Sequence, residues 1–101
     1  MTEHFDEEAA LAERQQKAQN LAERQESDMK FVLETVQGRR VIWDLLCRAG
    51  VFASSFTGDN NATNFNEGRR SEGLRLFNSV MAACPDLYLK MAAEAKEDNE
   101  K

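Results

Sequence analysis

Few side chains in this chain of 101 residues could support catalysis. The only histidine is His4, in a polar N-terminal segment, so a Ser-His-Asp or Cys-His pair would have to reach the core from an unfixed end. No cluster of histidines and cysteines indicates zinc, no phosphate-binding loop sequence is present, and the 18 acidic residues are dispersed. We therefore expect no catalytic residues, no metal site and no cofactor.

The tripeptide Gly-Arg-Arg occurs twice, at 38–40 and 68–70, and both copies fall near predicted helix starts. The four arginines concerned are Arg39, Arg40, Arg69 and Arg70. Positive charge at a helix start opposes the helix dipole, so each pair needs a compensating anion, which could be a phosphate backbone. The alternative is an intramolecular clamp, which we favour. Its candidate carboxylates are those of Glu67, Glu72, Asp44 and the acidic first helix.

The two cysteines, Cys47 and Cys84, are too few for a disulfide scaffold. Each stands in an apolar helical context, where a free thiol packs as a small hydrophobic group. We expect both to be reduced core residues.

Length and charge indicate a single small domain with polar ends, because 101 residues leave no room for two cores. The net charge of −5 disfavours nonspecific binding to nucleic acid or to an anionic membrane. Much of the charge lies in residues 1–27, which hold seven acids and three bases. No basic-then-apolar leader and no membrane-spanning apolar run is present, so we expect a cytosolic protein or one that assembles from the cytosol.

Residues 1–27 are predicted to form a polar helical arm, because they are rich in strong helix formers and lack glycine and proline. The thin apolar stripe of the arm consists of Phe5, Leu11, Ala18 and Leu21. A helix this polar is either a projecting arm or half of an interface with another chain. We expect it to pack against a neighbouring subunit.

Residues 28–91 are predicted to form a helical core and residues 92–101 a solvated tail, which gives an all-α fold of four to five helices. An N-cap at Ser27 or Asp28 and a stop at Gly38 predict a helix between them, and a further helix spans 39–50. A capping-box-like pair, Asn64 and Glu67, predicts the next helix, and Pro85 starts a short last one. The predicted core anchors are Trp43, Leu46 and Phe77.

Two further features belong to the predicted core. The irregular stretch 51–66 carries Phe52, Phe56 and Phe65, which we expect to fold back onto the core. Gly73 falls on the apolar side of a predicted helix, where glycine is costly, so a close approach of another helix is the plausible compensation.

Two stretches of the chain resemble the two signature blocks of the Bbp-nineteen-like phage domain: GRRVIWDLLCRAGVFASSF (38–56) and FNEGRRSEGLRLFNSVMAACPDLYLKM (65–91). This is a small domain family found in tailed, mostly short-tailed bacteriophages. The resemblance covers about 29–91. Members are typically encoded among head, portal and packaging genes, and the family has no activity that transfers to particular residues.

The resemblance implies a nonenzymatic phage virion or assembly protein, a helical adaptor near the portal and the head-to-tail junction. Its partners would be other virion proteins, such as portal or connector, and further copies of itself. The protein would be located in the host cytoplasm during assembly and then in the virion. Two alternatives remain open: a DNA-packaging accessory that contacts phosphates through the Gly-Arg-Arg arginines, and a host-directed inhibitor.

Overall fold

The computed structural model describes the backbone of residues 2–100 and the side chains of residues 6–100. Within this part of the chain four α helices and no strand are found, which confirms the all-α prediction. The helices are α1 (Thr2–Leu33), α2 (Val36–Arg48), α3 (Asn60–Ala83) and α4 (Pro85–Glu100).

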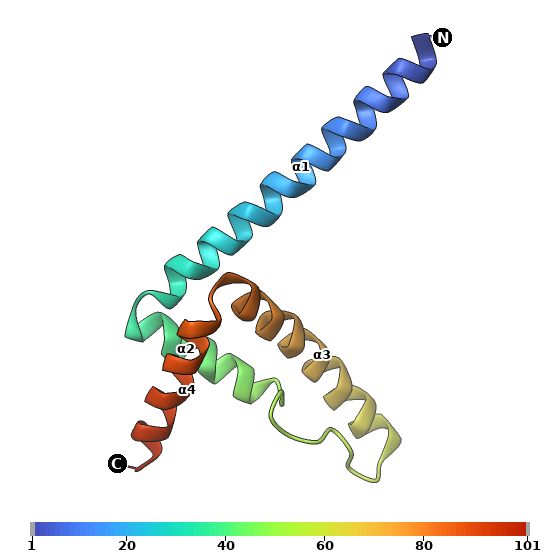
Figure 1. Cartoon of the computed structure of the whole chain (residues 1–101). Helices are drawn as coiled ribbons and strands as arrows, with labels where there is room; N and C mark the ends of the chain where they lie inside the picture. The colour runs from blue at the N-terminus through green and yellow to red at the C-terminus, as the bar shows by residue number, and fades with distance from the viewer. Residues whose placement is uncertain (1, 101) are drawn as a thin grey trace.

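The molecule is elongated because α1 projects away from the other helices (Figure 1). Its radius of gyration is 19.1 Å, whereas a compact domain of this length has about 13 Å. Only the C-terminal part of α1 belongs to the core, and every side chain from Leu11 to Asp28 is exposed. Helix α1 contacts α2 and α3, and α4 packs against both α2 and α3.

Helix α1 corrects the predicted break at Ser27 or Asp28, because it continues unbroken to Leu33. The chain turns at Glu34 and Thr35 instead, where Thr35 is the N-cap of α2 and its Oγ1 accepts from the backbone N–H of Gly38 at 3.0 Å. Gly38 therefore lies in the first turn of α2 and does not end a helix. A Cβ at Gly38 would overlap the carbonyl oxygen of Val32, so this tight turn requires a residue without one.

Helix α3 begins five residues earlier than the pair Asn64 and Glu67 predicts, because its N-cap is Asp59 and not Asn64. The carboxylate of Asp59 caps it by accepting from the backbone N–H groups of Asn61 and Ala62. The Glu67 side chain instead accepts from the hydroxyl of Ser55. The cap that the sequence pattern missed is the aspartate directly before the helix.

The three loop phenylalanines do not all return to the core. Phe52 stacks on Trp43 with ring centroids 5.1 Å apart, yet it stays half exposed. The prediction is wrong for Phe56 and Phe65, which are 78% and 68% exposed. Phe65 lies within α3, and the loop around Phe56 is held by polar bonds, such as that from the Thr57 N–H to the Thr63 hydroxyl. Polar contacts with the start of α3 therefore determine how this loop lies.

A small core joins the four helices. Its fully buried side chains come from each helix in turn: Leu33, Leu46, Val80 and Met91. Trp43 and Phe77 are half-buried and pack against this cluster. Phe77 meets Tyr88 edge to face, with centroids 5.2 Å apart.

Cys47 and the C-terminal end differ from their predicted environments. Cys47 and Cys84 are free thiols, but Cys47 is exposed, so the core assignment is wrong for that residue. Helix α4 runs to Glu100, and Ala92, Glu94 and Ala95 in the predicted solvated tail are half-buried.

None of the described helices is long and apolar enough to cross a membrane.

Gly73 and Gly68 allow a matched test of the predicted close approach. A Cβ at Gly73 would lie 2.6 Å from Cγ2 of Val51 and closer still to Cβ of Ala49, whereas one at Gly68 would meet nothing within 4 Å. We expect Gly73→Ala to lower the free energy of unfolding by about 1–3 kcal/mol through overpacking. Gly68→Ala should raise it by up to about 1 kcal/mol through helix propensity. Urea unfolding measures both, and equal effects would show that the close approach does not matter.

Candidate functional site

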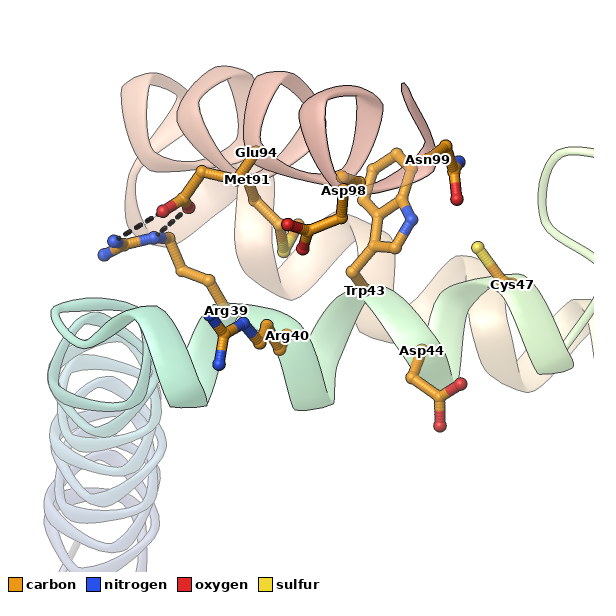
Figure 2. A pocket seen from close by; sticks show the side chains of 10 residues that line it. Arg39, Arg40, Trp43, Asp44, Cys47, Met91, Glu94, Asp98 and Asn99 are labelled. Atoms are coloured by element: carbon orange, nitrogen blue, oxygen red, sulfur yellow. Dashed lines mark hydrogen bonds and ion pairs between the residues drawn. The ribbon is translucent and has the colours of Figure 1, made fainter. Parts of the chain in front are cut away.

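The first Gly-Arg-Arg places Arg39 in the first turn of α2, where it is 5% exposed and joins three helices. Its Nε and Nη2 donate to the two carboxylate oxygens of Glu94 on α4, at 2.5 and 3.1 Å (Figure 2). Its Nη1 donates to the carbonyl oxygen of Leu33, the last residue of α1, at 2.8 Å. The planar guanidinium can make all three bonds at once because its donors form a fixed fork.

These bonds resolve the electrostatic conflict that the sequence raises. Arg39 opposes the dipole of α2, but the Glu94 carboxylate supplies the compensating negative charge. The carbonyl of Leu33 has no acceptor role inside α1, because the last carbonyls of a helix lack partners there. The hydrogen bonds from Arg39 lower the pKa of Glu94, and desolvation of the carboxylate opposes this shift. The same hydrogen bonds raise the pKa of Arg39.

The clamp exists, but its carboxylate was not among those predicted. Asp44 pairs with Arg48 at 3.1 Å and Glu72 with Arg75 at 3.3 Å, both on exposed helix faces. Glu94 was missed because the composition of 92–101 indicates a solvated tail. Continued helix after Pro85 is the signal that could have found it, since residues 87, 91 and 94 then share one face.

A groove of about 210 Å³ lies beside the clamp, between α2 and α4. Trp43, Cys47 and Asp98 line it together with Arg40, the exposed second arginine of the turn (Figure 2). Its volume is below the range of about 300–1,000 Å³ that is typical of small-molecule sites. Within the described residues no three histidine, cysteine or acidic side chains gather where they could hold a metal ion.

The second Gly-Arg-Arg is arranged differently, and it lies on the first half of α3, away from the start of α2 (Figure 1). Arg69 is exposed; its Nη2 donates to the side chain of Asn66 at 3.3 Å, and its guanidinium lies 5.7 Å from the centroid of the Phe65 ring. Arg70 is half-buried, and its Nε has no hydrogen-bond partner among the residues that the structure describes. The structure therefore does not bring the two arginine pairs together.

The predicted arm residues are displayed along α1. Leu11 and Leu21 are 55% and 45% exposed, and Ala18 is exposed as well. The side chain of Phe5 lies outside the described residues. Large apolar side chains in this position are available to another chain.

The fold and the Arg39 clamp define a small all-α protein with a helical core and a projecting helix. A family model described as Bbp19-like phage protein matches residues 29–93, which is more than half of the chain. The chain therefore belongs to the Bbp19-like phage protein family, as its two sequence blocks indicate. Comparison with curated proteins and with solved structures found no match.

The fork geometry of Arg39 is testable with its neighbour Arg40 as the matched control. Arg39→Lys keeps the charge but cannot bind both carboxylate oxygens and the Leu33 carbonyl together, so we expect a lower urea midpoint. Arg40→Lys changes an exposed side chain and should leave the midpoint unchanged. Equal midpoints for the two variants would contradict a structural role of the fork.

The clamp should also make stability depend on pH. Because the pKa of Glu94 is lower in the folded protein, its contribution is present above the unfolded value of about 4.3 and is lost as the pH falls through the folded pKa. We expect the difference in urea midpoint between wild type and Glu94→Gln to be largest near neutral pH and to shrink in acid.

Asp44→Asn is the control for that experiment, because it removes the same charge from an exposed pair. It should cost about 0.5 kcal/mol or less at neutral pH. A Glu94→Gln difference that stays constant down to the acid limit of folding would contradict the ion-pair interpretation.

Proposed function

We propose that this protein is a nonenzymatic bacteriophage virion or assembly protein that acts as a helical adaptor near the portal and the head-to-tail region. The observation that carries the proposal is α1, a helix of 32 residues whose side chains from Leu11 to Asp28 are all exposed. Membership of a phage protein family gives the setting.

A polar helix of this length is useful to a protein that joins others. Isolated helices are marginal in water, and helices of proteins gain most of their stability from packing an apolar face. Helix α1 has such packing only near its C-terminal end, so its exposed leucines favour a contact with another chain. The family is typically encoded among head, portal and packaging genes, which suggests that this contact is made near the portal and the head-to-tail region.

The clamp supports the adaptor role because it fixes the direction of the arm. Leu33 is fully buried, and its carbonyl is bound by Arg39, which is held by Glu94. A partner that binds the arm would therefore be held in a defined orientation to the core.

The second candidate function is a DNA-packaging accessory, and the second Gly-Arg-Arg is the observation that favours it. Arg69 and Arg70 have no carboxylate partner among the described residues, and the Nε of Arg70 lacks an acceptor. Phosphate could serve both. The first Gly-Arg-Arg offers less, since Glu94 already occupies Arg39, and the net charge of −5 opposes association with DNA.

Mass spectrometry of purified phage particles, with copy number, tests the proposal. We expect a stoichiometric amount of the protein in particles, in a copy number that matches the symmetry of the portal region. Absence from particles would contradict the structural role and favour a packaging accessory or a host-directed inhibitor. A gel shift with duplex DNA that falls steeply with salt, and disappears in Arg69→Ala and Arg70→Ala, would replace the adaptor proposal with the DNA-packaging one.

A further inference from the structure

One face of α1 continues from the core into the exposed arm. Apolar and uncharged polar side chains recur along it at alternating spacings of four and three residues, and we call this set the arm seam: Leu11, Gln15, Ala18, Ala22, Gln25, Met29 and Val32. The second half of the arm seam, from Ala22, lines a groove of about 580 Å³ between α1 and α3. Arg75, Ser79 and Ala82 of α3 form the other wall. Leu11 and Ala18 therefore lie on the same face of α1 as the residues that line this groove.

The arm seam is nearly the same when it is read in both directions. From Leu11 it reads Leu, Gln, Ala, and then Ala, Gln, Met up to Met29. Two antiparallel copies would thus set Leu11 against Met29, Gln15 against Gln25, and Ala18 against Ala22. Alanines at the centre allow close approach of the two helices, and only Val32, opposite a glutamate, lacks a matching side chain. A surface that complements itself in this way fits a two-fold axis.

The flank of the arm seam gives an independent match in charge. Arg14, Leu21 and Asp28 follow one another at seven-residue spacing on one side of the arm seam. In the same antiparallel pairing the flanking side chains are offset by two residues, about 3 Å along the helix, so that Leu21 lies beside Leu21 of the second copy and Arg14 beside Asp28 of the second copy. Both exposed leucines of the arm are covered by this one arrangement.

We propose that two copies of this protein pair through antiparallel α1 helices, with the axis beside Leu21 and the start of each arm in the α1–α3 groove of the other copy. Arg75 on the far wall of the groove is paired with Glu72. The α1 wall carries Glu26 and Asp28, and Asp28 is the carboxylate that this register places beside Arg14 of the incoming arm. This pairing deepens the proposed role in assembly and rests on it, since it names the surface through which copies join.

The size of the contact determines how tight the pairing should be. Arms that overlap from residue 11 to residue 29 run side by side for about 27 Å, at 1.5 Å per residue. A single strip between two helices is at or below the low end of specific interfaces, about 1,200 Å² in total. We expect a dimer that dissociates on dilution in the micromolar range, and that is more stable where an assembly concentrates the protein.

Sedimentation equilibrium of the full chain tests the register through a charge reversal. Arg14→Asp sets two aspartates against each other at both ends of the pair and should raise the dimer dissociation constant about tenfold or more. Combining Arg14→Asp with Asp28→Arg exchanges the two charges at an unchanged net charge of −5 and should restore the wild-type constant. Arg24→Asp is the matched control on the opposite side of α1, and it should dissociate like wild type.

Circular dichroism should give the same helix content and thermal midpoint for all four proteins, because the substituted side chains are exposed. A wild type that stays monomeric at every concentration would overturn the proposal and favour another phage protein as the occupant. So would equal effects of Arg14→Asp and Arg24→Asp, or a double variant that does not recover. A protein found stoichiometrically in particles but monomeric in solution refutes the pairing alone, whereas a dimer absent from particles refutes the proposed function alone.

Discussion

The hydrogen bonds of Arg39 are the interaction on which the arrangement of the helices depends. One guanidinium binds the last residue of α1 and a carboxylate on α4 from its own place in the first turn of α2. Withdrawing a charge from water is expensive unless its partners are well placed, and here the three bonds meet that condition. Without them, the charge of Arg39 would be buried between the helices with no partner. A buried charge without a partner would lower the stability of a core of this size.

The core and the arm differ in construction, and they share the C-terminal end of α1. The core packs helices around a few fully buried side chains, whereas the arm is a polar helix with exposed leucines. Leu33 belongs to both, since it ends the arm helix and is fully buried. The exposed part of α1 projects from this fixed end as a continuous helix. That combination would suit the adaptor role that we propose for this member of the Bbp19-like phage protein family.

The two Gly-Arg-Arg sequences show that the same three residues can have different roles. In the first, Gly38 permits the tight turn after α1 and Arg39 is held by Glu94. In the second, Gly68 faces open space, Arg69 rests near Phe65 and the Nε of Arg70 has no acceptor. The difference arises because the first lies where three helices meet and the second lies on the first half of one helix. Identical local sequence therefore does not imply a shared site.

The sequence by itself determined the all-α class, the polar helix at the start, the close approach at Gly73 and the phage family. These follow from helix propensity, from the cost of glycine in a helix, and from short blocks of residues, all of which are local properties. Only the tertiary structure decided that Glu94 is the partner of Arg39, that α1 ends at Leu33 and that Phe56 and Phe65 stay exposed. Each of these depends on which distant segments meet. Arg39 and Glu94 are 55 residues apart in the chain, and the spacing of residues within one helix carries no information about a partner on another.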